Sequence, residues 1–441
     1  MVFFDPQQGI IDRRIFSDED LYRQELDRVF GKSWLFLAHE GLLPNVGDYI
    51  TTYMGEDPVI VVRGVGGRVR AFLNSCPHRG NKVCLHDRGN ARTFTCSYHG
   101  WSFNTDGELK GIPFHQEAYL GELEAEAWGL VEVGRVESFG GLLFGCWDPT
   151  APTLESYLGD LCWYLEAFYL ALPLGGLEFP PGRQRYMSPG NWKIPSDNFS
   201  GDHYHTPYTH GSAFALQARA TSSREAPGTS PTGPFEVATG APYGKGLVPH
   251  GLGGLRTDDM FYRRDLQIAE TLGAEVVDWV KYRQAKIAKG AGRAAGGGFI
   301  RAHILPNFSI NGATSAFTAR GLYLWHPRGP HKTLAVEWCA VERDAPEIVK
   351  RRAVADFARG QSAAGFFGQD DTENFERVTE NTRTPLATRL PFNYTMGLRH
   401  ETSWPGSDAW ETEGLPGLIG PRFSEINQRR FYAHWAKLME A

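Results

Sequence analysis

The sequence predicts an α+β fold in which an all-β module precedes a larger region of helices and further strands. Between about Trp34 and Pro149, short runs of β-branched and aromatic residues are separated by turn signals such as Asp106-Gly107, as in strands joined by hairpins. The runs are Tyr49–Tyr53, Val59–Arg63, Val69–Leu73 and Gly141–Gly145. After Pro149 longer helical patterns appear, and strand character returns over residues 301–342.

Local signals predict where some elements begin and end. Ser17 is followed by acidic residues and is expected to cap a first helix, and Ser424 is expected to cap the last one. Residues 221–256 are rich in Gly, Pro, Ser and Thr. Such a composition predicts a long surface loop.

The composition argues against several classes of protein. With 441 residues, of which 41% are hydrophobic, the chain is long enough for two or three domains with sizeable cores. The net charge of −6 and the lack of basic runs interleaved with aromatics argue against nucleic-acid binding. No apolar run approaches the ~20 residues of a membrane span, and no signal peptide is apparent. Of the six cysteines, four (Cys84, Cys146, Cys162 and Cys339) are scattered without the pattern of a disulfide framework, which favours a reducing cytoplasm.

Two short motifs, Cys76-Pro77-His78-Arg79-Gly80 and Cys96-Ser97-Tyr98-His99-Gly100-Trp101, each offer one thiolate and one imidazole. A [2Fe–2S] centre of the Rieske kind needs two Cys on one iron and two His on the other. The alternative is a structural zinc site, which also accepts two Cys and two His. Zinc-finger spacing groups Cys with Cys and His with His, whereas each motif here mixes the two. Gly80 and Gly100 are expected to take positive φ values that glycine tolerates.

A second constellation lies in residues 197–210, which hold three His and two Asp among aromatic residues. Two His and one carboxylate on one side of a metal form the non-haem iron(II) site of oxygenases and leave positions open for O2. His205 and His210 are the candidate pair. Five residues apart, they align poorly on an ideal helix, so Pro207 is expected to distort the helix between them.

The third ligand is left open by the residues alone. Asp202 lies three residues before His205, on the same helical face. The distant alternative is the acidic cluster within residues 368–374, which contains Asp370 and Asp371.

In their order and spacing, these motifs resemble the large (α) subunit of Rieske non-haem iron aromatic-ring-hydroxylating dioxygenases, of the naphthalene/biphenyl dioxygenase type. The resemblance covers nearly the whole chain. The matching segments are residues 76–80, 96–101, 191–193, 197–205, 209–210 and 365–371. The resemblance implies an all-β Rieske [2Fe–2S] domain at residues 35–153. This domain would be inserted into a catalytic domain, residues 1–34 and 154–441, built on an antiparallel sheet flanked by helices.

The resemblance also implies roles for single residues. The cluster would be held by Cys76, His78, Cys96 and His99, and the mononuclear Fe(II) by His205, His210 and Asp371, with Asp370 as the fallback. Asp202 would be a bridging carboxylate that links His205 to the cluster ligand His99 of a neighbouring subunit. The candidate substrate-binding residues are Asn198, Phe199, His203, Asn307, Phe366 and Phe367. Two of them depart from the family, since Phe367 stands where relatives often have Trp and His203 where a small residue is common.

The activity that the resemblance implies is O2-dependent cis-dihydroxylation of an aromatic hydrocarbon or related aromatic compound, with O2 as co-substrate. Electrons would come from NAD(P)H through a ferredoxin and/or a reductase. The expected assembly is an α3β3 hexamer with a small β subunit, or α3 alone. The alternatives are a Rieske monooxygenase or demethylase, and a Rieske electron carrier, which would leave the region after Pro149 without a role. A third alternative is a zinc-binding interaction protein.

Overall fold

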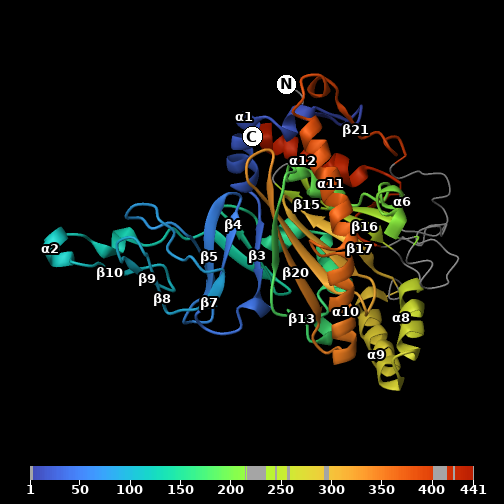
Figure 1. Cartoon of the computed structure of the whole chain (residues 1–441), viewed down its shortest axis with the longest axis horizontal. Helices are drawn as coiled ribbons and strands as arrows, with labels where there is room; N and C mark the ends of the chain where they lie inside the picture. Colours follow the sequence, from blue (N-terminus) through green and yellow to red (C-terminus); the bar gives the residue numbers. More distant parts are fainter. Residues whose placement is uncertain are drawn as a thin grey trace. The chain divides into compact units, whose positions relative to one another are not determined.

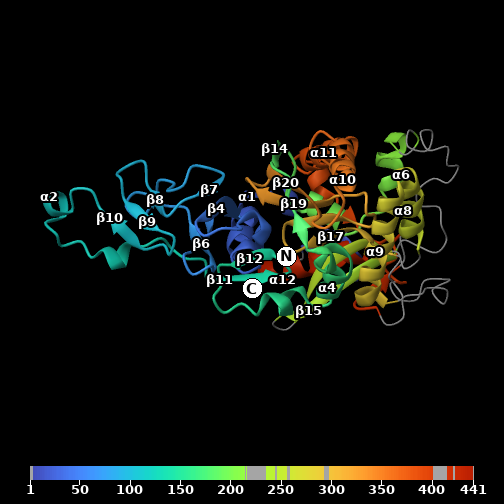
Figure 2. The ribbon, with the colours of Figure 1, turned by 90° about the horizontal axis from the view of Figure 1, so that it is seen from below.

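The structure is a computed structural model of the 441-residue chain, and it describes residues 3–213, 215, 235–243, 246–255, 259–292, 297–400, 415–420 and 423–440. For residues 235–243 and 246–249 it describes the backbone only. The chain divides into two compact units (Figure 1, Figure 2). One comprises residues 30–154, and the other comprises residues 1–29 together with 155–441.

The smaller unit is built from antiparallel sheets. One has the strand order β6-β5-β4-β7, and two three-stranded sheets have the orders β10-β9-β8 and β11-β12-β3. The strands are β3 (Leu35–His39), β4 (Asp48–Met54), β5 (Asp57–Arg63), β6 (Val69–Leu73), β7 (Arg88–Asn90), β8 (Thr93–Thr95), β9 (Ser102–Asn104), β10 (Leu109–Gly111), β11 (Arg135–Phe139) and β12 (Leu142–Cys146). The predicted all-β module is therefore confirmed, with only short helical segments such as α2 (His115–Tyr119) added.

The hydrophobic core of the smaller unit reaches directly to the two Cys-His motifs. Cys76 and Cys96 are each 2% exposed and pack in one cluster with Trp101 and Phe103. Because the motif cysteines belong to a close-packed core, the loops that carry them are held in fixed positions.

The larger unit is organised around one antiparallel sheet with the strand order β13-β20-β19-β18-β17-β16-β15-β22, and β14 also pairs with β20. The strands are β13 (Leu177–Glu178), β14 (Gln184–Ser188), β15 (Phe235–Tyr243), β16 (Gly246–Leu255), β17 (Phe299–Ile304), β18 (Phe308–Ala313), β19 (Arg320–Pro327), β20 (Thr333–Glu342) and β22 (Leu418–Gly420). All residues of β19 are buried, so both faces of the sheet are covered at its centre.

Helices flank this sheet, as predicted. Helices α10 (Glu347–Gly360) and α11 (Phe366–Asn381) lie against β20 and β14 (Figure 1, Figure 2). Helix α12 (Ile426–Glu440) packs on β15 and β16, and α5 (Lys193–Phe199) contacts β16, β17 and β18. Helices α8 (Met260–Glu270) and α9 (Ala274–Ala291) pack on each other.

The loop predicted over residues 221–256 is wrong for residues 235–243 and 246–255, which form the antiparallel pair β15–β16; residues 221–234 lie outside the described residues. At least one of the glycines that suggested a loop, Gly251, is needed for close packing. A Cβ atom on Gly251 would lie 2.4 Å from the carbonyl oxygen of Ser200. Glycine in a strand allows another backbone to approach closely, and here it lets the chain after α5 lie on the sheet.

The helix caps were predicted with mixed success. Asp18, not Ser17, caps α1 (Glu19–Glu25), because its carboxylate accepts hydrogen bonds from the backbone N–H groups of Asp20 and Leu21. The Ser424 hydroxyl accepts from the N–H of Ile426 (3.2 Å) at the start of α12, as predicted. None of the helices in the described part of the chain combines the length and apolarity that crossing a bilayer requires.

A buried ion pair anchors α5 to two other helices. The Lys193 ammonium lies 2.6 Å from Glu25 Oε1, and both side chains are 0% exposed. Glu25 also accepts hydrogen bonds from the indole N–H groups of Trp192 (2.9 Å) and Trp435 (2.8 Å). The Asn-Trp-Lys segment before the second constellation is thus structural: it fixes α5 between α1 and α12.

Glu25→Ala is expected to lower the free energy of unfolding by about 3–5 kcal/mol, because it leaves the buried Lys193 ammonium without a counter-charge. Chemical denaturation of the variant measures this loss. Glu373→Ala is the matched control, since its ion pair with Arg377 is more than 60% exposed on both sides and such pairs contribute about 0–1 kcal/mol. Equal losses of unfolding free energy in the two variants would contradict the claim that the Lys193–Glu25 pair anchors α5.

Candidate active site and metal centres

The two Cys-His motifs fold into loops of the same geometry. The Gly80 N–H donates to the Cys76 carbonyl (2.8 Å), and the Gly100 N–H donates to the Cys96 carbonyl (3.0 Å). In each loop, the N–H of the cysteine bonds to the carbonyl five residues further on. Gly80 and Gly100 have φ values of 74° and 75°, in the left-handed region that glycine enters without strain, as predicted.

The two loops sort the side chains by type. The Cys76 and Cys96 thiols are hydrogen-bonding neighbours, and the imidazole rings of His78 and His99 lie with their centroids 4.4 Å apart. Each motif mixes Cys with His in sequence, yet in space Cys meets Cys and His meets His. A Rieske [2Fe–2S] centre needs this arrangement, with both thiolates on one iron and both imidazoles on the other.

The His78 ring has the features of a metal ligand. Its Nδ1 is buried and has no hydrogen-bond partner among the described residues, a costly state unless another group occupies it. Burial, with the nearby charge of His99, lowers the pKa of His78, which favours the neutral, metal-binding imidazole. A single zinc ion would need at least three ligand atoms around one point. Among the described residues, only a different group of His and acidic side chains converges in that way.

That converging group is His205, His210 and Asp371, whose ligand atoms all lie within 4.8 Å of one another. Asp371 Oδ1 is 3.4 Å from His205 Nε2 and 3.2 Å from His210 Nε2. The two histidines flank the single-turn helix α6 (Thr206–Thr209), and Asp371 projects from α11. Two imidazoles and one carboxylate meeting at one point form the donor set of a non-haem iron(II) site.

The helix is interrupted as predicted, but at His210 rather than at Pro207: the helical residues 206–209 and 211–213 are separated by His210, whose φ of −105° and ψ of 16° are not helical. Helix α6 begins at Thr206 and ends at Thr209, so His205 and His210 occupy its two cap positions. Pro207 lies in its first turn, where the missing N–H has no intrahelical partner to lose. The two imidazoles meet because the helix is short, with their ring centroids 5.2 Å apart.

The other two acidic candidates contact the opposite nitrogens of the same histidines. Asp370 Oδ2 lies 3.3 Å from His210 Nδ1, and Asp202 Oδ2 lies 3.2 Å from His205 Nδ1. Carboxylates in this position fix the tautomer and ring orientation of a metal-binding histidine and direct its Nε2 to the metal. The geometry thus distinguishes the three acids: Asp371 alone faces both Nε2 atoms, whereas Asp202 and Asp370 each contact one Nδ1 atom.

The electrostatics of the site follow from these contacts. Burial tends to raise the pKa of Asp371, but hydrogen bonds with His205 and His210 outweigh it and hold that pKa well below its usual range. Burial tends to lower the pKa of His205, but Asp202 and Asp371 raise it to about 9. Burial also opposes ionisation of Asp202, whose pKa is nevertheless lowered by His205. The site therefore keeps Asp371 ionised at a position suited to a cation and Asp202 ionised on the far side of His205.

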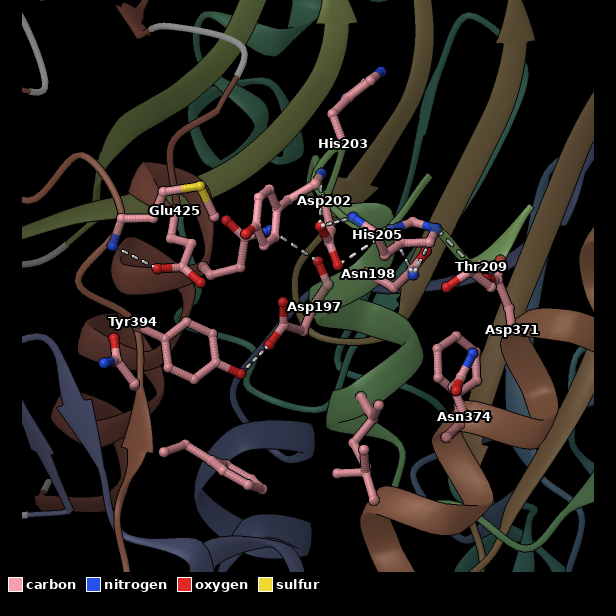
Figure 3. A pocket seen from close by; sticks show the side chains of 18 of the residues that line it. Asp197, Asn198, Asp202, His203, His205, Thr209, Asp371, Asn374, Tyr394 and Glu425 are labelled. Carbon is pink, nitrogen blue, oxygen red and sulfur yellow. Dashed lines mark hydrogen bonds and ion pairs between the residues drawn. The ribbon is translucent and has the colours of Figure 1, made fainter. Parts of the chain in front are cut away.

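A cavity of about 440 Å³ borders this group (Figure 3). Its wall includes His205, Asp371 and Asp202 on one side and residues from β21 (Phe392–Asn393) onward on the other. Of the predicted substrate-binding residues, Asn198 and His203 line it. The Asn198 amide also lies 3.4 Å from His205 Nε2, and its oxygen accepts a hydrogen bond from Arg301 (3.0 Å).

The other predicted substrate-binding residues do not line this cavity. Phe199 packs against Tyr323, with ring centroids 4.9 Å apart, and Asn307 is 2% exposed and donates to the Trp325 carbonyl. The Phe367 ring lies 5.0 Å from the His210 ring, and Phe366 is 39% exposed beside it.

Several residues of the site escaped the sequence analysis. Asp197, Tyr394 and Glu425 line the cavity, and Arg301 donates to Asn198. Asp197 begins the segment 197–205 that carries the family resemblance, but its partner Tyr394 lies almost 200 residues further along the chain, so no local spacing reveals the pair. Asp370 was considered only as a ligand, and its contact with His210 Nδ1 was missed.

Comparisons with known proteins agree with this geometry. Residues 33–134 match the family model described as Rieske [2Fe-2S] domain, and residues 180–441 match that described as ring hydroxylating alpha subunit (catalytic domain). The chain is 36% identical over 441 residues to the biphenyl 2,3-dioxygenase subunit alpha of Rhodococcus jostii, covering 99% of this chain and 90% of that protein. It is 35% identical over 424 residues to the large oxygenase component of a naphthalene 1,2-dioxygenase system of Pseudomonas aeruginosa, covering 95% and 89%.

Solved structures extend the comparison. A naphthalene 1,2-dioxygenase with indole in its active site superposes with a TM-score of 0.84 at 31% identity, over 100% of this chain and 94% of that one. A quaternary ammonium Rieske monooxygenase has a TM-score of 0.66 at 18% identity, over 99% and 97%, and shares the fold. The family uses a Rieske [2Fe–2S] cluster, a mononuclear iron and O2. The chain belongs to this family, as the large (α) oxygenase subunit of an aromatic-ring-hydroxylating dioxygenase.

Proposed function

We propose that this subunit cis-dihydroxylates an apolar aromatic ring at an iron(II) ion held by His205, His210 and Asp371. The observation that carries the proposal is the contact of one carboxylate oxygen, Asp371 Oδ1, with both Nε2 atoms. Iron(II) bound there would supply the O2 chemistry, because a donor set of two His and one carboxylate leaves coordination positions open. Asp371 supplies the anionic charge, while Asp202 and Asp370 hold the two imidazoles by their Nδ1 atoms.

We assign the [2Fe–2S] cluster to Cys76, His78, Cys96 and His99, in a Rieske domain at residues 35–153. The catalytic domain then comprises residues 1–34 and 154–441. The assignment is supported by the equivalence of the two loops and by the pairing of like side chains. In this arrangement the imidazole side of the cluster is the more accessible, since both histidines are partly exposed while both cysteines are buried.

Asp202 is proposed as the electron-transfer bridge. Its Oδ1 accepts from the backbone N–H groups of Tyr204 and His205, which fixes the carboxylate, while its Oδ2 contacts His205 Nδ1. The Asp202 side chain is 34% exposed, so it remains within reach of a ligand histidine, His99, on a neighbouring subunit. A hydrogen-bonded carboxylate between two metal-ligating imidazoles makes a short polar path.

The substrate is proposed to be an aromatic hydrocarbon or a related aromatic compound, because relatives are named for biphenyl, naphthalene and chlorobenzene. Asn198 and His203 are assigned to its binding on the strength of their place in the cavity wall. Phe199, Asn307, Phe366 and Phe367 complete the proposed set. Of these four, Phe367 has the strongest support, because its ring lies against the ligand His210.

The proposed electron donors are a ferredoxin and/or a reductase that uses NAD(P)H. The proposed assembly is an α3β3 hexamer with a small β subunit, with α3 as the alternative, in the cytoplasm. Head-to-tail packing of α subunits follows from the bridge, since Asp202 of one subunit would meet the cluster of the next.

Metal analysis with oxygen-isotope labelling tests the proposed function. The purified protein is expected to contain two cluster irons and one further iron per chain, to be red-brown, and to show a low-field EPR signal on reduction. With ¹⁸O2, a reductase system and an aromatic substrate, both hydroxyl oxygens of the product are expected to carry the label. One labelled oxygen would favour a monooxygenase, and zinc in place of iron would contradict the assignment.

A further inference from the structure

A cluster of hydroxyl and carboxyl groups in the cavity wall has no role in metal binding. Tyr394 and Tyr432 both donate hydrogen bonds to Asp197 Oδ2, at 2.5 Å and 2.9 Å. Their rings contact each other with centroids 5.3 Å apart. Figure 3 shows Asp197, Tyr394 and Glu425 around the same cavity as Asp202. The cluster joins three distant parts of the chain: α5, the segment after β21, and α12 with the turn before it.

The charges that face Asp197 are mostly acidic. Asp202 and Glu425 both act on Asp197 as like charges. From α12, Gln428 donates to the Asp197 backbone carbonyl, and the Arg429 guanidinium donates to the carbonyls of Tyr394 and Met396. Among the described residues, no cation forms an ion pair with the Asp197 carboxylate. Asp197 is therefore a carboxylate held by neutral donors beside other acids.

These surroundings let Asp197 exist in both protonation states near neutral pH. Burial, with a smaller contribution from Asp202, raises the pKa of Asp197 to about 7, against the opposing hydrogen bonds of the two tyrosines. Burial likewise raises the pKa of Glu425 to about 7. The pKa values of Tyr394 and Tyr432 lie well above their ordinary range, chiefly through burial, so both phenols stay protonated as donors.

We propose that Asp197, held by Tyr394 and Tyr432 and with Glu425 as a second acid on the same wall, stores a proton and supplies it to the reaction in the cavity. The inference rests on the proposed dihydroxylation. That reaction consumes one O2, two electrons from the external donors and two protons. The O–O bond breaks, two C–O bonds form, and the protons end on the two new hydroxyl groups. Negative charge entering a site of low polarity raises the proton affinity of nearby carboxylates, and Asp197 is a carboxylate to which the described part of the chain offers hydrogen-bond donors but no ion-pairing cation.

Asp197→Asn keeps the shape of the side chain but removes the titratable proton. Its kcat is expected to fall about a hundredfold, in line with the loss of a proton-transfer group, with less product per O2 consumed and no inflection near pH 7 in the kcat profile. Tyr394→Phe removes a hydrogen bond that favours the ionised carboxylate, so it is expected to move the inflection to higher pH. A group with a merely structural role would leave the inflection in place.

The matched control is Asp265→Asn. Asp265 is another buried carboxylate, and it lies on α8, outside the cavity. It accepts hydrogen bonds from the Ser315 hydroxyl (2.5 Å) and the Ala316 N–H (2.7 Å). This variant is expected to retain the wild-type kcat, yield per O2 and pH profile. Full activity of Asp197→Asn with a normal profile would overturn the proposal, as would reduced activity with the inflection unchanged.

A second readout does not depend on turnover. The pKa of Asp197 is raised in the folded state from 3.8 to about 7, so the folded protein binds more protons than the unfolded chain between these values. Stability is therefore expected to fall as pH rises through this window and to level off above pH 7. The Tm of the Asp197→Asn holoenzyme should decline less than that of the wild type between pH 5 and pH 8; an equal decline overturns the proposal. If the wild type gave no dihydrodiol, the proposed function would fail while this difference in Tm would persist.

Discussion

Asp371→Ala is expected to remove iron from the catalytic site and to reduce turnover below detection. The reason is geometric: Asp371 Oδ1 is the atom that faces both His205 Nε2 and His210 Nε2. Without it, the two imidazoles remain, and the site loses the one carboxylate that, among the described residues, faces both Nε2 atoms. Loss of a hydrogen-bond partner behind a metal-ligating histidine already costs ~10–100-fold in metal affinity or activity, and loss of a ligand is expected to exceed that.

Asp370→Ala is the matched control, because it removes a neighbouring carboxylate from the same helix. Asp370 contacts His210 Nδ1 rather than the metal position, so this variant is expected to lose only ~10–100-fold in activity or iron affinity. Iron content per chain and the EPR signal of the cluster are measured for both proteins. The cluster signal should persist in both, since its ligands lie elsewhere. Iron retained in Asp371→Ala and lost in Asp370→Ala would reverse the assignment.

The contrast between Asp371 and Asp370 marks the limit of what the sequence could predict. The residue types and the approximate segments are readable, because Cys-His motifs and a His-rich stretch restrict the possible chemistry to a few metals. Which of two adjacent acids meets the histidines depends on the rotation of α11 against α6, and these helices are separated by more than 150 residues of chain. Spacing alone left Asp202, Asp370 and Asp371 open, and the family resemblance ranked them.

Local rules failed where tertiary packing decides the outcome. Pro207 was expected to distort the helix between the two histidines, but the helix is interrupted at His210 instead. The glycines of β16 suggested a loop, yet Gly251 is glycine because the Ser200 backbone lies against it. In the second case the chain after α5 lies on the sheet, and this contact requires a residue that propensity scales assign to turns.

The proton-storing cluster shows a different limit. Asp197 is one of several acids in a motif, and only its two tyrosine partners distinguish it. Those partners come from residues 394 and 432, one beyond β21 and one within α12. Neither residue type nor spacing links a tyrosine near the end of the chain to an aspartate near its middle. Coupled groups of this kind emerge only when the fold brings them into contact.

Asp202→Ala is expected to retain both metal centres and yet to lose at least about a hundredfold in turnover supported by the external electron donors. Iron should stay, because His205, His210 and Asp371 keep their Nε2 and Oδ1 atoms in place. Electron transfer should fail, because the carboxylate on His205 Nδ1 is the proposed link to the next subunit. Rapid mixing of the reduced variant with O2 and substrate measures this directly, as the rate at which the cluster is reoxidised.

Hydrogen peroxide separates this failure from damage to the site itself. Peroxide carries the atoms of O2 together with the two electrons and two protons that the reaction needs, so it requires no transfer from the cluster. Asp202→Ala is therefore expected to lose no more of its peroxide-driven rate than Asp370→Ala does (~10–100-fold), although its turnover with the normal donors should fall well below that of Asp370→Ala; Asp371→Ala should form no product from peroxide. Wild-type turnover of Asp202→Ala with the normal donors would refute the bridge. Failure with peroxide, with iron still bound, would mean that Asp202 acts by orienting His205 rather than by conducting electrons to it.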